Sequence, residues 1–155
     1  MRFLNRLQRY YTFMASSKIP WDRLWSRVWK MIPEPETNGR LLVALDDFIN
    51  PKTGKNIFGC ANVFDHAAKQ NQSKYPWTQN VVSIGLLKMI KGRWACLPLS
   101  HRYYHLKKDI EQNRPRQRHS GKEIKFQSKH CQAVEMIADV AAEFPESNIT
   151  IVSDS

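Results

Sequence analysis

Two short apolar segments that each run into aspartate constrain the fold of this chain most. Leu41–Leu45 leads into Asp46 and Asp47, and Ile149–Ser153 leads into Asp154. Compact runs of this kind predict buried strands, and the second run is also rich in β-branched residues. If the two strands are adjacent and parallel, their aspartates meet at the carboxyl ends, where open α/β sheets commonly bind ligands. The pattern therefore predicts an α/β fold with an acidic site at one edge of its sheet.

Further strands are expected between these two segments. Turn chemistry at residues 50–54, with Pro51 and Gly54, predicts a hairpin after the first strand. Apolar stretches then predict the return strand of the hairpin and two later strands, at Ile57–Phe64, Gln79–Ile90 and Arg93–Leu97, the last ended by Pro98. The expected arrangement is a three-strand antiparallel meander.

A helix is expected between the meander and the last strand. Ser128 is a suitable N-cap, and Pro145 ends the helix. Apolar residues at helical spacing predict the face that packs on the sheet, namely Val134, Ile137, Ala138, Ala141 and Phe144.

The first 39 residues differ in character from the rest of the chain. They mix basic and aromatic side chains, and their spacing predicts two short amphipathic helices. Pro33, Pro35 and the turn at residues 37–39 end this segment. We therefore expect an N-terminal basic and aromatic helical segment over residues 1–39 and a second domain over residues 40–155.

The charge of the chain favours a polyanionic partner. Lys and Arg number 24 against 14 Asp and Glu, which gives a net charge of +10 and makes nucleic acid the leading candidate. The stretch from Lys107 to Lys129 is basic and poor in apolar residues, so it is the expected DNA-contacting surface, with a solvated loop as the alternative. The expected DNA-binding residues are Lys107, Lys108, Arg114, Arg116, Arg118 and Lys122.

Composition also bears on location. The three cysteines form no C-x-x-C pair, which fits a reducing cytosol. The N-terminus has no apolar stretch long enough for a signal peptide, and the most apolar stretch, Val81–Ile90, is too short and too interrupted to span a membrane. We expect a cytoplasmic protein without a membrane partner.

Aspartates on neighbouring strand ends suit phosphoryl-transfer chemistry with divalent metal. Mg²⁺ and Mn²⁺ prefer hard oxygen ligands, and two ions about 4 Å apart activate the attacking oxygen and stabilise the leaving one. The ordinary alternative is that Asp46 and Asp47 belong to a strand-end turn, since Asp favours turns.

The same residues resemble a known family. The segment Leu42–Phe48, followed by Pro51–Lys55, is similar to the opening strand and hairpin of bacterial insertion-sequence DDE transposases. Asn80–Ile84 resembles that family's next strand, and Ile149–Ser155 resembles the strand that bears its second catalytic aspartate. The resemblance covers residues 40–155. It implies an RNase H-like fold, with an antiparallel three-strand meander followed by a helix and a parallel strand, that nicks and joins DNA through Mg²⁺ or Mn²⁺.

The resemblance also implies roles for individual residues. Asp47 corresponds to the first catalytic aspartate and metal ligand, and Asp154 to the second. Phe48 stands where the family has Thr, which leaves Asp46 as a substitute for Asp47.

The family's third carboxylate is a Glu that follows the second aspartate. Glu135, Glu143 and Glu146 all precede Asp154 and do not fit that order. The expectation is therefore an RNase H-like domain incomplete at its C-terminus, and a truncated transposase that is inactive alone. Its expected partners are transposon-end DNA and either a second copy or a complementing C-terminal fragment. The alternatives are a non-catalytic DNA-binding or regulatory fragment and a decayed gene product that scarcely folds.

Overall fold

The computed structural model describes residues 12–13, 19–54, 57–112 and 124–154. The chain divides into two compact units, residues 1–31 and 32–155, and each is described by itself. The sequence places this boundary later, after residue 39. Helix α2 (Trp21–Lys30) belongs to the first unit and corresponds to one of the two expected amphipathic helices. The rest of the first unit lies mostly outside the described residues.

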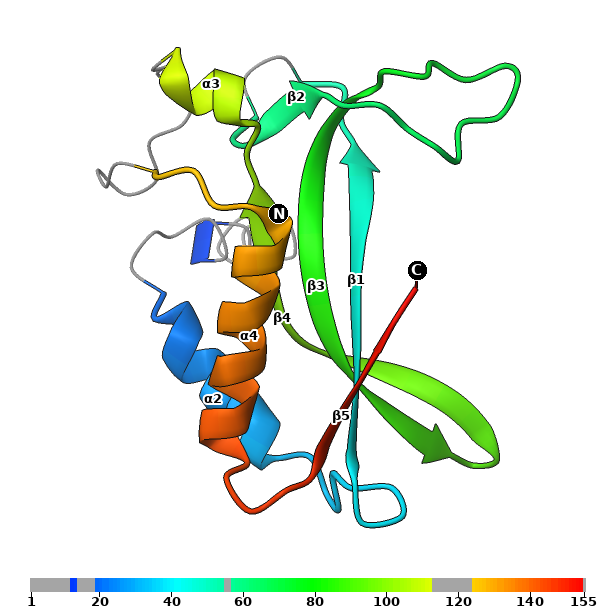
Figure 1. Cartoon of the computed structure of the whole chain (residues 1–155), viewed down its shortest axis with the longest axis vertical. Helices are drawn as coiled ribbons and strands as arrows, with labels where there is room; N and C mark the ends of the chain where they lie inside the picture. Colours follow the sequence, from blue (N-terminus) through cyan, green and yellow to red (C-terminus); the bar gives the residue numbers. More distant parts are fainter. Residues whose placement is uncertain (1–11, 14–18, 55–56, 113–123, 155) are drawn as a thin grey trace, which may run out of the picture. The chain divides into compact units, whose positions relative to one another are not determined.

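The second unit contains a five-stranded mixed sheet (Figure 1). Its strands run in the order β2-β3-β1-β5, and β4 pairs with β3. Their bounds are β1 (Leu41–Pro51), β2 (Cys60–Asn62), β3 (Trp77–Ile90), β4 (Arg93–Tyr104) and β5 (Ile149–Ser153). Two helices, α3 (Lys107–Glu111) and α4 (Lys129–Glu143), lie between β4 and β5 in the sequence.

Strands β1 and β5 are adjacent and parallel, as the sequence predicts. Their ladder runs from the pair Leu41 and Ile149 to the pair Leu45 and Ser153. Strand β1 does not end there, because β3 continues to pair with it as far as Pro51. The expectation that Asp47 ends the first strand is therefore wrong. Asp46 and Asp47 lie inside β1, just beyond the end of its parallel ladder.

The expected hairpin between the first and second strands is also wrong. Strand β2 has three residues and pairs with β3, and β1 has β3 as its antiparallel neighbour. The long antiparallel strands of the unit are thus β1, β3 and β4, and the short β2 is also antiparallel to β3. Because β3 is long and buried over most of its length, it supplies ladder partners to β1 on one side and to β2 and β4 on the other.

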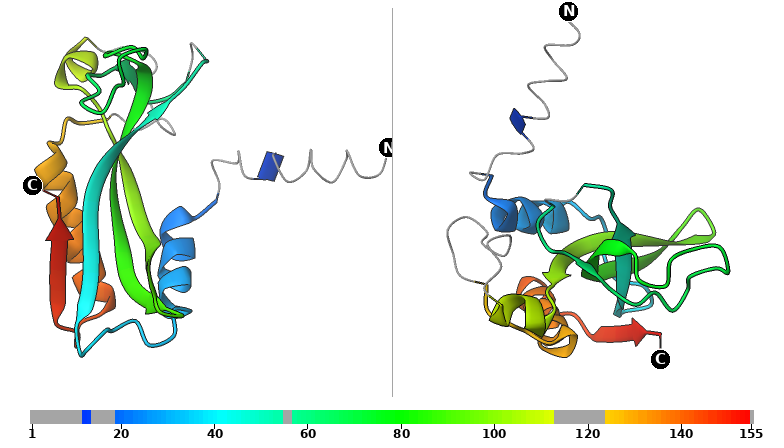
Figure 2. Two further views of the ribbon diagram at one scale, coloured as in Figure 1. Left: turned by 90° about the vertical axis from the view of Figure 1, so that its right-hand side faces the viewer. Right: turned by 90° about the horizontal axis from the view of Figure 1, so that it is seen from above.

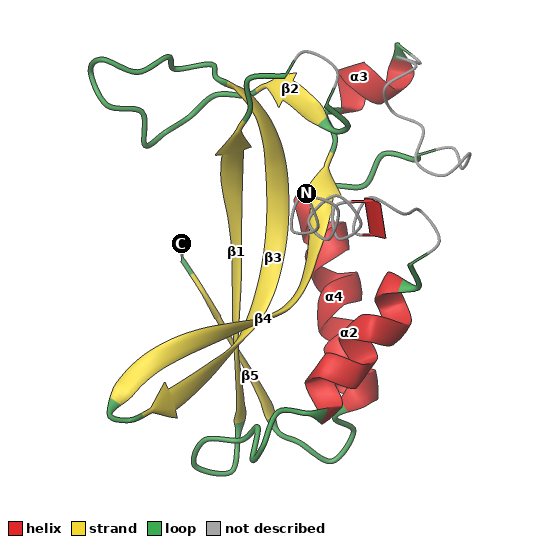
Figure 3. Cartoon of the chain, turned by 180° about the vertical axis from the view of Figure 1, so that it is seen from behind, coloured by secondary structure: helices red, strands yellow, loops and turns green. Residues whose placement is uncertain are grey.

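Strand β4 runs through Pro98, where the sequence predicts its end. The pairing with β3 shifts register between Ile84 and Gly85, which leaves Leu99 as an extra residue in β4. Proline is tolerated on edge strands and at bulges, and among the described strands β4 pairs only with β3. Figure 3 shows β3 and β4 continuing beyond β1 as a two-stranded ribbon. Lys91 and Gly92 close the ribbon with positive φ angles of 50° and 74°, as a type I′ turn requires.

Helix α4 lies against one face of the sheet (Figure 2). Ser128 caps it as predicted, because its Oγ accepts a hydrogen bond from the Cys131 N–H at 3.2 Å. The predicted buried face is wrong: Ala133, Met136 and Val140 are buried, whereas Val134 is 66% exposed.

The helix carries apolar residues on two adjoining stripes, so spacing alone does not select the one that packs on the sheet. The core that results contains Leu41, Val43, Ile84, Leu86, Leu99, Met136 and Val140.

Candidate functional site

Asp47 lies on the face of β1 that is directed toward α4. Side chains alternate along a strand, so Asp47 shares a face with Leu41 and Val43, which are both fully buried. Its Oδ2 is 2.6 Å from the Nζ of Lys129, in the first turn of α4. Both side chains are partly exposed, at 43% and 37%, so water screens this ion pair.

Asp46 points to the opposite face of the strand by the same alternation. Its Oδ1 accepts a hydrogen bond from the Asp47 N–H at 2.7 Å. Local side-chain to backbone bonds of this kind are typical of Asp. The two neighbouring carboxylates therefore have different surroundings.

The structure brings the predicted aspartates to one cleft of about 280 Å³, here called the carboxylate cleft. Asp154 reaches it from the residue after β5, and Asp47 from the middle of β1. The cleft is lined by Leu45, Asp46, Asp47, Val82, Lys129, His130, Ala133, Ser153 and Asp154. Convergence at the carboxyl end of the parallel pair agrees with the expectation from the sequence.

Sequence reasoning missed Lys129 and His130. In the sequence, Lys129 is the end of the basic connector, and its place directly after the cap Ser128 also puts it at the start of a helix. The Lys129 Nζ also lies 5.4 Å from the centre of the Tyr104 ring. The carboxylate cleft thus holds positive as well as negative charge.

The donors in the cleft fit a divalent cation in kind but not in number. Carboxylate oxygens are the ligands that Mg²⁺ and Mn²⁺ prefer. Over the described part of the chain, no three His, Cys, Asp or Glu side chains gather closely enough to hold a metal ion. Glu135 belongs to another network, since Arg102 and Gln127 both bond its carboxylate.

The predicted DNA-contacting connector is described only at its start. Lys107 and Lys108 are exposed on α3, where Lys107 forms an ion pair with Glu111 at 3.7 Å. Arg114, Arg116, Arg118 and Lys122 lie outside the described residues.

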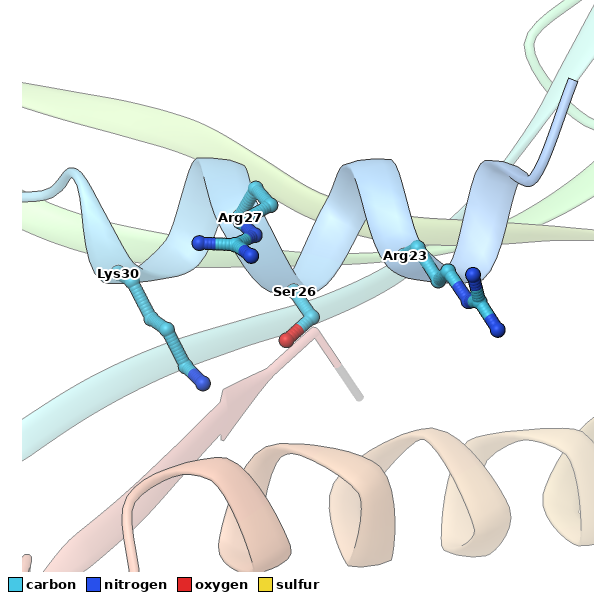
Figure 4. Close-up of a pocket in the computed structure, with 4 residues that line it drawn as sticks. All are labelled: Arg23, Ser26, Arg27 and Lys30. Atoms are coloured by element: carbon cyan, nitrogen blue, oxygen red, sulfur yellow. The ribbon is translucent and has the colours of Figure 1, made fainter.

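Helix α2 presents a second group of basic residues, within the first unit. Arg23, Arg27 and Lys30 recur at helical spacing and, with Ser26, line a shallow surface on the helix (Figure 4). All three basic side chains are exposed. The sequence predicts an amphipathic helix here, but Arg23, Arg27 and Lys30 are not among the DNA-binding residues expected from it.

One thiol in the second unit has a shifted pKa. Burial raises the pKa of Cys60 in β2, and the nearby Lys52 opposes that shift. Cys60 lies outside the carboxylate cleft.

The fold and the cleft together define a class of protein. A five-stranded mixed sheet with α4 on one face, and acidic residues beside its parallel strand pair, is a mixed α/β fold consistent with an RNase H-like DDE domain. Residues 5–155 match the model of the DDE superfamily endonuclease family, and the chain belongs to that family. Membership implies a DNA substrate and the use of divalent metal in general.

No curated protein and no solved structure matches the chain. No helix in the described residues is long and apolar enough to cross a membrane.

Proposed function

We propose that Asp47 and Asp154 are the first two carboxylate ligands of a DDE transposase, which cleaves and joins DNA strands with Mg²⁺ or Mn²⁺. The observation that supports this is their convergence on the carboxylate cleft from neighbouring parallel strands. The bound ions would polarise a phosphate and activate the attacking oxygen. The two aspartates would hold and orient that charge, because Asp47 lies within β1 and Asp154 directly follows β5.

Asp47 is the better ligand of the two adjacent aspartates. It shares its strand face with the residues that pack beneath α4, whereas Asp46 bonds the backbone N–H of Asp47 on the other face. Asp46 also borders the carboxylate cleft, but the Asp47 N–H engages its Oδ1, so it serves as a matched control with the same chemistry one residue away.

Lys129 complements the aspartates in this proposal. Its ammonium group neutralises Asp47 in the free protein, at 2.6 Å. Next to a DNA strand, the same group lies where it can bind a phosphate oxygen as a compact positive charge.

Calorimetric titration of the full chain with Mn²⁺ tests the assignment. We expect Asp47→Asn and Asp154→Asn each to weaken binding by about tenfold or more, because each removes one anionic ligand. Asp46→Asn should leave the affinity unchanged. Mn²⁺ binding that survives the double substitution of Asp47 and Asp154, or that is lost in Asp46→Asn, would overturn the proposal.

We also predict that the 155-residue chain alone does not cut DNA. The described residues offer no group of three acidic, His or Cys side chains for metal, and a two-carboxylate site binds and orients metal poorly. A nicking assay on supercoiled plasmid in Mg²⁺ and in Mn²⁺ measures this. Nicking that disappears in Asp47→Asn would contradict the prediction of inactivity while supporting the site.

Three further expectations from the sequence stay predictions. They are that the DNA substrate consists of transposon ends, that the partner is a second copy or a complementing C-terminal fragment, and that the protein is located in the bacterial cytoplasm.

A second candidate function is DNA binding without catalysis, which the basic face of α2 favours. Arg23, Arg27 and Lys30 can each neutralise a backbone phosphate without reading sequence. DNA affinity measured against salt in EDTA separates this function from the catalytic one.

Replacing the three basic residues of α2 with Gln should reduce the salt slope by about 2 to 3, since each phosphate contact contributes about 0.9. A control that neutralises three exposed basic residues of the second unit, Lys69, Lys91 and Arg93, should change the slope less. Equal changes in both triple variants would mean that net charge alone drives binding.

A further inference from the structure

A second, larger groove adjoins the carboxylate cleft. Its volume is about 610 Å³, and it shares Asp47 and Lys129 with the cleft. Its lining includes the aromatic residues Phe48, Phe64 and His66, together with Asn80. This surface, here called the aromatic groove, is thus continuous with the site proposed for the reacting phosphate.

The rings of the aromatic groove are exposed to solvent. Phe48 is 48% exposed and Phe64 is 41% exposed, although folding usually removes such side chains from water. Phe64 forms T-shaped contacts with the rings of His66 and Tyr75, with centroid distances of 4.7 and 5.3 Å. These contacts gather the three rings into one cluster, and a flat ligand can stack on an exposed ring face.

The segment that carries Phe64 and His66 is fixed by its own hydrogen bonds. Its two arms pair through the Asp65 N–H, which donates to the Lys74 carbonyl at 2.9 Å. The Asp65 carboxylate then accepts a hydrogen bond from the Ala67 N–H at 2.9 Å. The aromatic side chains therefore project from an ordered loop, which reduces the entropy lost when a ligand binds.

Asn80 adds a polar group that the fold does not use. It is only 4% exposed, yet its Oδ1 accepts no hydrogen bond from any described residue. Asn80 pairs with Ile49 across the β1–β3 ladder, so its side chain lies on the same face as Asp47. A buried acceptor without a partner is costly, and a ligand that donates a hydrogen bond to it would remove that cost.

We propose that the aromatic groove binds an unpaired nucleobase of the DNA strand whose phosphate lies in the carboxylate cleft. Rings that stack on a base, an amide that bonds its polar edge and a lysine beside its phosphate are the groups that recognise a nucleotide. The inference rests on the proposed function for the position of the phosphate.

The test uses the full chain, in EDTA, with a short labelled single strand containing 2-aminopurine and with the matching duplex. Phe64→Leu removes the stacking ring but keeps apolar bulk, and His66→Ala removes a second ring. We expect each variant to bind the single strand about tenfold more weakly, the lower range for one stacked base. We also expect each variant to quench 2-aminopurine less, and binding of the duplex to change little.

Trp94→Ala is the matched control, because Trp94 is an aromatic residue that is 57% exposed on β4 and does not line the groove. It should leave both measurements unchanged. Thermal melts of all variants check that each remains folded. Single-strand affinity and quenching that do not change in Phe64→Leu, or that fall equally in Trp94→Ala, would overturn the proposal.

Asn80→Leu tests the polar part of the groove separately. Leucine keeps the branched shape of asparagine and removes the buried acceptor, so we expect a melting temperature that is unchanged or higher. The affinities of single strands that each contain one type of base should differ from one another less in this variant. Undiminished base preference would show that Asn80 does not contact the base.

The two proposals can fail independently. Mn²⁺ binding that depends on Asp47 should persist in Phe64→Leu if the groove only holds a base. If Mn²⁺ binding is the same in Asp47→Asn as in the unmodified chain, while quenching still depends on Phe64, the carboxylate proposal fails and the groove proposal remains.

Discussion

At the scale of single residues, the proposed chemistry depends on which side of one strand each carboxylate occupies. Asp46 and Asp47 are adjacent and chemically identical, but only Asp47 forms an ion pair with Lys129. That contact has a measurable consequence, because a lysine bound to a carboxylate competes with any cation for the same oxygen atoms.

Replacing Lys129 with Met should therefore raise the affinity of the chain for Mn²⁺. The ion pair is partly exposed and contributes at most about 1 kcal/mol, so we expect an increase of up to about fivefold. Calorimetric titration measures it, with Lys107→Met as a control in which another exposed lysine loses its carboxylate partner. A lower affinity in Lys129→Met would mean that the lysine orients Asp47 for the cation instead of competing with it.

Gly85 is a second residue whose role is decided by its surroundings. A Cβ atom added there would lie 2.5 Å from the Cys96 Sγ and 3.2 Å from the Leu97 carbonyl oxygen. Gly85→Ala should therefore destabilise the protein by about 1 to 3 kcal/mol, as overpacking does. Urea denaturation measures the loss. The double variant with Cys96→Ala should recover part of the loss, and no recovery would place the strain on the backbone contact.

At the scale of elements, the first turn of α4 links stability to the carboxylate cleft. Ser128 caps the helix, and the next residue is the lysine that reaches Asp47. Farther along, Arg102 of β4 bonds Glu135 and also Asp139, the latter at 3.0 Å, which ties α4 to the sheet.

Removing the cap with Ser128→Ala should reduce the free energy of unfolding by about 1 kcal/mol. Ser128→Asp keeps an acceptor at the same position and should retain most of the stability. Urea unfolding followed by circular dichroism compares the two variants. If both lose the same stability, the hydroxyl group of Ser128 contributes through something other than capping.

At the scale of the whole molecule, the second unit has one continuous core between α4 and the sheet. Leu41, Ile84, Leu86, Met136 and Val140 come from distant parts of the sequence, and all are fully buried. A shared core of this kind couples the unfolding of its elements.

We therefore predict a cooperative thermal transition for the sheet signal in circular dichroism. Coincident transitions by circular dichroism and by tryptophan fluorescence would support one folded unit around this core. A broad melt without a clear midpoint would instead favour the reading of a decayed chain that scarcely folds.

Much of the fold follows from local sequence patterns. The apolar runs at Leu41–Leu45 and Ile149–Ser153 predicted the parallel strand pair, and Ser128 predicted the start of α4, because these signals act over a few neighbouring residues. The convergence of Asp47 and Asp154 followed from the same runs. Strand ends were less predictable: β1 continues through both aspartates because β3 supplies hydrogen-bond partners beyond Leu45.

Only the tertiary structure decided which faces and which partners the elements use. Two apolar stripes on α4 satisfy the same helical spacing, and packing against β3 and β4 buries the one with Met136. Lys129 pairs with Asp47 across 82 residues of sequence, and Asn80 and Phe64 line one groove although they lie in different segments. Local patterns carry no information about such pairs, because they form only when distant segments bury a common core. The sequence by itself therefore determined the elements and the acidic residues, and packing decided what surrounds them.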